Sequence, residues 1–118
     1  MHELSIASNL VELVTETAQG AHALKVLKVH LRLGALAGIS VESLRFCYEI
    51  ATANTLLAGS ELIVEHLPVV VHCSKCDRAV ATEGIQAIAC PFCGTPSNDI
   101  KQGHDLEIAS IEIEEFTI

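Results

Sequence analysis

Hydrophobic residues recur at helical spacing near the start of the chain and at strand spacing soon afterwards. Between residues 4 and 18 an apolar stripe predicts an amphipathic helix. The stripe consists of Leu4, Ala7, Val11, Val14 and Ala18, and is widened by Ile6, Leu10 and Leu13. From residue 27 to residue 33, apolar residues beginning with Leu27 alternate with Lys28, His30 and Arg32. This alternation predicts a strand with one face toward water.

The same patterns predict one more helix and two more strands. A glycine-containing turn ends at Ser40, which we expect to cap a helix over residues 41–53. A second strand is expected over residues 61–71, where Pro68 indicates an edge position or a break. A third is expected over residues 106–113, with a bulge near Ala109 and Ser110 because the apolar phase shifts there. The elements together predict an α+β fold.

Two Cys-x-x-Cys pairs lie between the second and third predicted strands. Cys73 and Cys76 form the first pair and Cys90 and Cys93 the second, with thirteen residues between the pairs. Such pairs direct four thiolates at one centre, which suits tetrahedral zinc, whereas two disulfides or a redox pair are the alternatives. The segment has few apolar residues, so we expect metal binding to supply much of its folding energy.

The composition argues against several classes of function. The 118 residues suffice for one domain, or for one domain with a small appendage. A net charge of −8, with only one Tyr, three Phe and no Trp, argues against nucleic-acid binding. No apolar run approaches the roughly 20 residues of a membrane helix, and no secretory signal is evident. With an odd number of cysteines as well, we expect a cytoplasmic protein.

The first three residues carry donor atoms that could bind a second kind of metal ion. The amine of Met1, the amide nitrogen of His2 and the imidazole Nδ1 of His2 can close two adjacent chelate rings, and Glu3 can supply a fourth donor. A planar set of nitrogen donors suits Ni(II) or Cu(II) and does not suit tetrahedral zinc. The alternatives are a frayed first turn or a His2 that caps its own helix. The residue types alone leave these interpretations open.

A resemblance to a known family extends over nearly the whole chain. It rests on Met1-His2-Glu3-Leu4-Ser5, on residues 34–38 before residues 41–49, on the two cysteine pairs and on residues 103–113. These stretches resemble the HypA/HybF family of hydrogenase nickel-insertion accessory proteins. The resemblance implies that Met1, His2 and Glu3 bind Ni(II) as transferred cargo, and that the cysteines hold a structural Zn(II). The four cysteines are Cys73, Cys76, Cys90 and Cys93.

The resemblance also implies a domain organisation. A nickel-binding α/β domain, residues 1–70 and 101–118, is expected to contain a small mixed three-stranded sheet and two helices. It carries the zinc-binding domain, residues 71–100, as an inserted zinc-ribbon-like module. Some family members have histidines inside the cysteine pairs, whereas here the nearest is His72, just outside the first pair. We therefore expect no histidine to replace a cysteine at the zinc.

The expected function is that of a nickel metallochaperone, not an enzyme, which delivers Ni(II) for insertion into a hydrogenase large subunit. Expected partners are a hydrogenase-maturation GTPase, contacting the first helix and the Met1 region, and the hydrogenase large subunit. The chain is expected to be a monomer or a weak homodimer that binds neither nucleic acid nor membrane. Two other classes remain open, namely a zinc-ribbon interaction adaptor without metal delivery and a thiol redox protein without zinc. Among the remaining candidates, Cys47, His22, His30 and His66 are expected to lie outside both metal sites, and His104 could approach either one.

Overall fold

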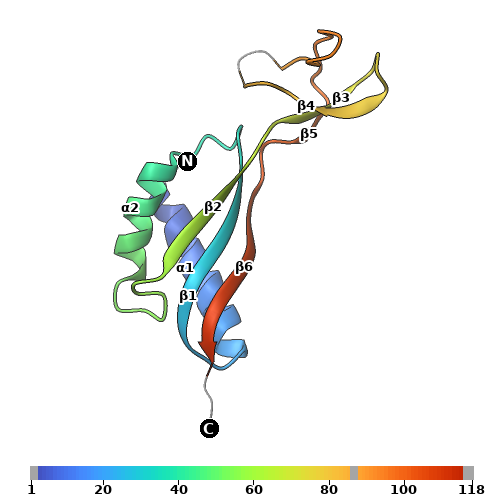
Figure 1. Cartoon of the computed structure of the whole chain (residues 1–118). Helices are drawn as coiled ribbons and strands as arrows, with labels where there is room; N and C mark the ends of the chain where they lie inside the picture. Colours follow the sequence, from blue (N-terminus) through green and yellow to red (C-terminus); the bar gives the residue numbers. More distant parts are fainter. Residues whose placement is uncertain (1–2, 86–87, 116–118) are drawn as a thin grey trace. The chain divides into compact units, whose positions relative to one another are not determined.

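The computed structural model describes residues 3–85 and 88–115, and Figure 1 shows its helices and strands. The elements are α1 (Glu3–Gly20), β1 (Ala23–Gly34), α2 (Val41–Thr52), β2 (Glu61–Leu67), β3 (Val70–Cys73), β4 (Arg78–Ala81), β5 (Ile100–Gln102) and β6 (Leu106–Glu115). The strands form two sheets of three strands each, in the orders β2-β1-β6 and β4-β3-β5. The expected α+β class with an inserted cysteine module is therefore confirmed.

The sheet β2-β1-β6 is mixed. In Figure 1, β1 and β2 run in one direction and β6 runs against them. Side-chain pairs agree with this arrangement, because His30 contacts Glu112 whereas Arg32, further along β1, contacts Glu107. The chain between β2 and β6 contains both cysteine pairs and the second sheet. It is thus inserted between two strands of one sheet, as the sequence predicted.

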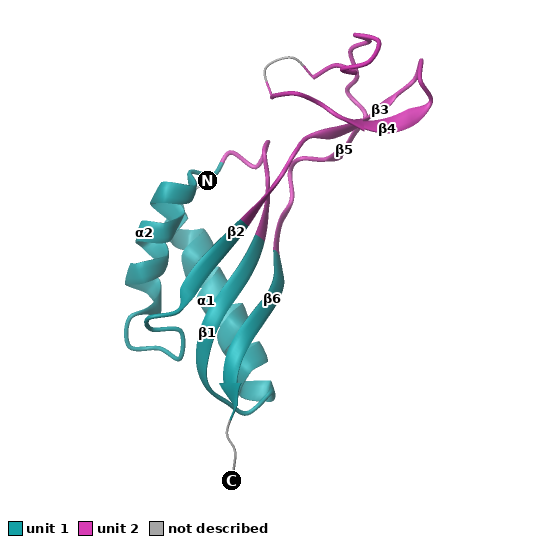
Figure 2. Cartoon of the chain, viewed as in Figure 1, with its two compact units in different colours: residues 1–31, 39–64, 108–118 teal, residues 32–38, 65–107 magenta. Residues whose placement is uncertain are grey.

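The chain divides into two compact units, coloured separately in Figure 2. Unit 1 comprises residues 1–31, 39–64 and 108–118, and unit 2 comprises residues 32–38 and 65–107. The unit boundaries fall within the strands β1, β2 and β6. The domain division expected from the sequence, residues 1–70 with 101–118 against residues 71–100, stays a prediction.

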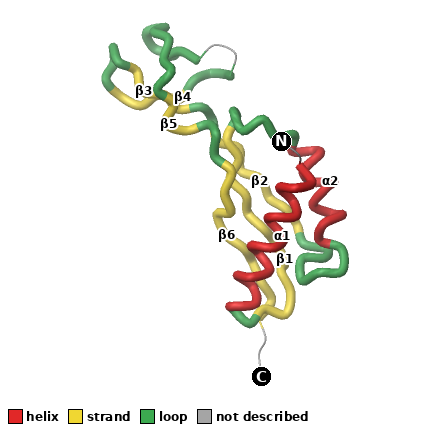
Figure 3. Tube along the Cα trace, turned by 180° about the vertical axis from the view of Figure 1, so that it is seen from behind, coloured by secondary structure: helices red, strands yellow, loops and turns green. Residues whose placement is uncertain are grey.

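Helix α1 turns one apolar side toward the core of unit 1, and Figure 3 shows it lying along one face of the sheet. Its buried residues are Ile6, Ala7, Leu10, Val14 and Ala18. Leu4 and Leu13 were expected in the stripe, but their side chains are 50% and 54% exposed. The predicted helical period is confirmed. The prediction that Leu4 and Leu13 belong to the buried stripe is wrong, because only one side of the helix is packed.

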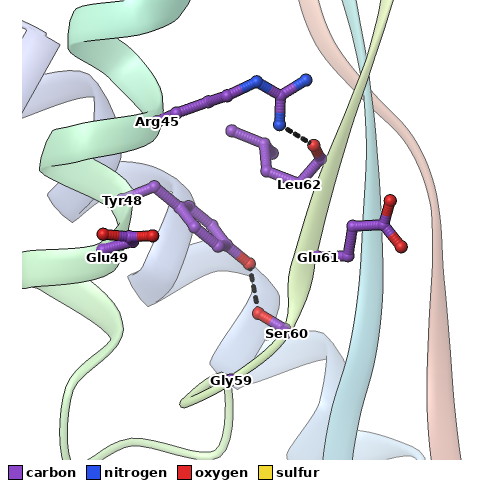
Figure 4. Close-up of a pocket in the computed structure, with 7 residues that line it drawn as sticks. All are labelled: Arg45, Tyr48, Glu49, Gly59, Ser60, Glu61 and Leu62. Atoms are coloured by element: carbon purple, nitrogen blue, oxygen red, sulfur yellow. Dashed lines mark hydrogen bonds between the residues drawn. The ribbon is translucent and has the colours of Figure 1, made fainter.

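Helix α2 begins at the expected cap. The side chain of Ser40 accepts a hydrogen bond from the amide of Ser43 at 3.2 Å, which satisfies one of the free N–H groups of the first turn. Leu44 and Tyr48 are buried on the side that the sequence indicated. The Tyr48 hydroxyl lies 2.6 Å from Oγ of Ser60, so this buried ring keeps a polar partner (Figure 4).

The strands of the larger sheet follow the predicted alternation with adjustments at their ends. β1 is longer than expected and buries Val29 and Leu31, whereas Leu27 is 44% exposed. β2 ends at Leu67, directly before Pro68, because proline cannot donate to a ladder. The break predicted at that proline is confirmed.

The apolar phase of β6 shifts where the sequence indicated. Ile108, Ile111 and Ile113 pack against the core of unit 1. Ala109 and Ser110 are both exposed between the first two, so the inward side changes phase at this pair. A strand with strict alternation would have placed one of these two residues inward.

Candidate metal sites

Two turns bring the four cysteines of the pairs together in unit 2. Cys73 ends β3, and Cys76 follows in the turn that leads to β4. The second pair encloses a turn in which the amide of Gly94 donates to the carbonyl of Cys90 at 2.8 Å. Cys73 and Cys90 are buried. In the first turn the amide of Cys76 donates to Sγ of Cys73 at 3.4 Å, so a local hydrogen bond closes each turn.

The sulfur atoms are spaced like the ligands of a single ion. Sγ of Cys73 lies 3.5 Å from Sγ of Cys93, and Sγ of Cys76 lies 3.9 Å from Sγ of Cys90. All four sulfurs lie within 4.8 Å of one another. Zinc–sulfur bonds of about 2.3 Å in a tetrahedron place the sulfurs about 3.8 Å apart. All four cysteines are free, so the donor set and its spacing fit zinc and exclude disulfides in this structure.

The thiols of this group have strongly divergent acidities. The hydroxyl of Thr95, 3.1 Å from Sγ of Cys93, lowers the pKa of the Cys93 thiol to about 6. Hydrogen bonding to the Cys93 sulfur, and then to Cys73, raises the pKa of the Cys76 thiol to about 12. Sulfurs held this close cannot all carry negative charge without a cation between them. A bound divalent cation would replace the retained protons, which is the usual coupling of metal binding to thiol deprotonation.

Both cysteine turns use a left-handed residue directly after their second cysteine. Asp77 follows Cys76 with φ of 52°, and Gly94 follows Cys93 with φ of 75°. Glycine adopts such angles readily, whereas aspartate adopts them less often. Nε2 of His72 lies 3.4 Å from a carboxylate oxygen of Asp77. Among the described residues, the group of possible ligands contains the four cysteines and no histidine.

The small core of unit 2 includes two of the cysteines themselves. Its buried members are Val69, Val71, Cys73, Val80 and Cys90. Val71 and Val80 face each other across the antiparallel pair of β3 and β4. No pattern in the sequence predicts this second sheet, because its strands of three or four residues carry too little alternation.

The surface beside the second cysteine pair carries an exposed aromatic ring. Phe92 is 70% exposed, and the guanidinium carbon of Arg78 lies 4.6 Å from the centre of its ring. The distance is within the range of a cation–π contact. No local pattern in the sequence connects these two residues.

At the N-terminus the structure describes one of the three predicted nickel residues. Met1 and His2 lie outside the described residues, and Glu3 is the first residue of α1. The side chain of Glu3 lines a pocket of about 530 Å³ together with Glu42, Ser43, Phe46 and Cys47 of α2. The sequence does not reveal these neighbours, because they become adjacent only when the two helices pack.

The other histidines and the fifth cysteine lie outside the four-cysteine group in the described ranges. His30 contacts Glu112 at 3.0 Å on the sheet, rather than only solvent. Cys47 packs partly buried against the core of unit 1. Three other histidines are exposed, namely His22, His66 and His104.

Comparison with known proteins decides the family. A family model described as hydrogenase/urease nickel incorporation, metallochaperone, HypA matches residues 1–113. The chain belongs to the HypA family. The hydrogenase maturation factor HypA of Chloroflexus aurantiacus is 44% identical over 112 residues, which cover 95% of this chain and 98% of that protein. The HypA of a Roseiflexus species is 42% identical over 117 residues, which cover 99% and 95%.

Solved HypA structures share the fold. The solution structure of the Ni metallochaperone HypA from Helicobacter pylori matches with a TM-score of 0.69 at 22% identity, covering 98% of this chain and 100% of that one. A second solution structure of a HypA protein matches with a TM-score of 0.68 at 23% identity, covering 96% of each chain. Within residues 3–85 and 88–115, no helix is long and apolar enough to cross a bilayer.

Proposed function

We propose that this chain is a nickel metallochaperone that binds Ni(II) at its N-terminus and delivers it for insertion into a hydrogenase large subunit during maturation. The main support is the match to the HypA model, which begins at residue 1 and so includes Met1, His2 and Glu3. The two relatives described above are hydrogenase maturation factors, and one solved structure with the same fold is called a Ni metallochaperone.

The chemistry of the first residues suits a transferred ion. The proposed donors are the amine of Met1, the amide and imidazole nitrogens of His2, and a backbone or carboxylate donor of Glu3. Nitrogen donors in a plane favour Ni(II) over zinc. Because the proposed donors belong to consecutive residues, a receiving protein can replace them one after another. This arrangement supports reversible binding of nickel.

The four cysteines are proposed to hold zinc as a resident structural ion. Cys73 and Cys76 would bind from the end of β3, and Cys90 and Cys93 from the second turn. When bound, zinc would supply a link between two segments that the small core of unit 2 holds only weakly. Four thiolates enclose such an ion and leave no open position, which suits structure rather than transfer.

The proposed partners follow from the same role. A maturation GTPase would contact the start of α1 and supply or regulate nickel, and the hydrogenase large subunit would receive it. Phe46 is 65% exposed and lines the pocket beside Glu3, so apolar surface is available next to the proposed nickel site. The cytoplasm is the proposed location, and a monomer or weak homodimer is the proposed state.

Nickel titration of the untagged protein tests the proposal. His2→Ala, or one residue added before Met1, should abolish high-affinity Ni(II) binding in calorimetry and leave the zinc content unchanged. His22→Ala is the matched control, because His22 is exposed and lies outside the proposed donors. Retained nickel binding in both N-terminal variants would place the site elsewhere. Zinc as the sole metal after nickel challenge would favour the adaptor function.

Acid should weaken nickel binding. The amine, the imidazole and the backbone amides must lose protons to coordinate, so affinity should fall from pH 7 to pH 5. Equal affinities at the two pH values would contradict the donor set. Cys73→Ala should lower the zinc content and leave the nickel stoichiometry unchanged, because the two sites use different residues.

A further inference from the structure

Strand β6 forms an edge of the larger sheet. It is ten residues long, and its neighbour in the order β2-β1-β6 is β1. Figures 1 and 3 show β6 at the side of the sheet, with α1 over one face of the sheet rather than beside this edge. Across the part of the chain that the structure describes, no strand pairs with the outer side of β6. An edge of this length offers backbone N–H and C=O groups to an added strand.

The opposite edge of the same sheet is already engaged. The guanidinium of Arg45 on α2 donates a hydrogen bond to the backbone carbonyl of Leu62 in β2 (Figure 4). A strand approaching β2 would have to displace this side chain. The two edges therefore differ, and β6 is the more accessible one.

An apolar groove lies under the β6 edge. It has a volume of about 360 Å³ and is formed by Leu13, Val14 and Thr17 of α1 and by residues 108–111 of β6. Leu13 is 54% exposed there, and the hydroxyl of Thr17 donates within the helix to the carbonyl of Leu13 at 3.0 Å. In an added strand, every second side chain would point toward the helix layer. The groove would take such a side chain if it were apolar.

The charges of β6 favour an incoming strand that carries basic side chains. Its sequence carries Glu107, Glu112, Glu114 and Glu115 and no Lys or Arg. Antiparallel pairing of β6 with a second β6 about its centre would place Glu107 opposite Glu114, and like charges directly opposite are destabilising. Lysine or arginine on the incoming strand would instead meet carboxylates. The net charge of −8 gives the whole chain the same preference for a basic partner.

We propose that the β6 edge and the groove beneath it bind an extended segment of a partner protein in which basic and apolar residues alternate. The segment pairs with β6 through its backbone and adds a strand to the sheet. Its apolar side chains enter the groove beside Leu13, and its basic side chains lie next to Glu112 and Glu114. This surface is independent of nickel, so its test uses no metal.

The probe is a synthetic peptide of nine residues in which Lys and Val alternate. Binding to the full chain is measured by fluorescence anisotropy, and amide shifts are followed by NMR in the ¹⁵N-labelled protein. We expect shifts concentrated in residues 108–115 and slower hydrogen exchange there. A peptide with every second amide N-methylated should lose binding, because it cannot complete the ladder. A peptide with Glu in place of Lys should also fail to bind.

Two variants distinguish the contribution of the groove to binding from that of the charges. Leu13→Gln should weaken binding about tenfold, which corresponds to about 1.4 kcal/mol. Ile50→Gln is the matched control, because Ile50 is 55% exposed on α2 and does not line the groove. Replacing Glu114 by Gln should weaken binding and reduce its dependence on salt.

Three results would overturn the proposal. They are equal binding of the N-methylated peptide, shifts that lie outside β6 and α1, and equal losses in Leu13→Gln and Ile50→Gln. Sedimentation of the chain without peptide tests whether a second copy of this chain occupies the edge instead of a partner segment. A dimer that dissociates in Leu13→Gln and protects the β6 amides without peptide would assign the edge to self-association instead.

Discussion

Removing the proposed zinc ion from the four-cysteine group should unfold the cysteine-containing part of unit 2 and leave the core of unit 1 in place. The core cluster that contains the cysteines has three other buried members, namely Val69, Val71 and Val80. Burial of a valine contributes about 2 kcal/mol, so the three together contribute about 6 kcal/mol. A structural zinc ion contributes about 10–16 kcal/mol near neutral pH. Losing the ion therefore removes more free energy than these valines supply.

Hydrogen exchange of individual amides measures this effect. The protein is compared before and after treatment with a zinc chelator, and a Cys73→Ser variant is examined in parallel. Amides of Val71 and Val80, which face each other across β3 and β4, should exchange like those of an unstructured chain. Amides of Val29 and Leu31, which are buried in β1, should keep their protection. Adding zinc back should restore protection to the chelated protein and not to the variant.

A second cysteine variant serves as the control for the loss of a thiol. Cys47 lies outside the group and packs against the core of unit 1, so Cys47→Ser should leave the zinc content and the protection of Val71 and Val80 unchanged. Undiminished protection of these two valines after complete removal of zinc would refute the reasoning. The apolar contacts of unit 2 would then be sufficient without an ion.

Two further substitutions test close contacts elsewhere. Gly34→Ala should destabilise the protein by about 1–3 kcal/mol in urea denaturation, because an added Cβ would lie 2.2 Å from the carbonyl oxygen of Gly103. Gly20→Ala, where nothing lies within 4 Å, should be neutral or stabilising, and equal effects of the two changes would contradict the close approach. The hydrogen bond from His30 holds the pKa of Glu112 below its ordinary value of 4.5, so this contribution to stability is present above that pH and is lost as the pH falls through the lowered pKa. His30→Gln should raise the pKa of Glu112 in an NMR titration, and an unchanged value would exclude the imidazole as the cause.

The sequence by itself determined the features that depend on short-range chemistry. Ser40 was recognisable as a cap and Pro68 as a break, because each acts on backbone groups a few residues away. The spacing of the two cysteine pairs indicated a single centre, and the structure brings all four sulfurs within 4.8 Å. The helical period of α1 and the phase shift in β6 could also be predicted from the sequence, because each is a pattern of apolar residues within one element.

Only the tertiary structure decided which of these residues are covered and which lie together. Leu13 fits the apolar stripe of α1 but stays exposed, because the packed layers reach one side of the helix only. The pocket beside Glu3 and the groove under β6 join side chains from elements far apart in the sequence. Periodicity reports the preference of a residue for burial, whereas the presence of a neighbour depends on how complete elements pack. The short strands of unit 2 show the same limit, because their pairing partners rather than their own patterns make them a sheet.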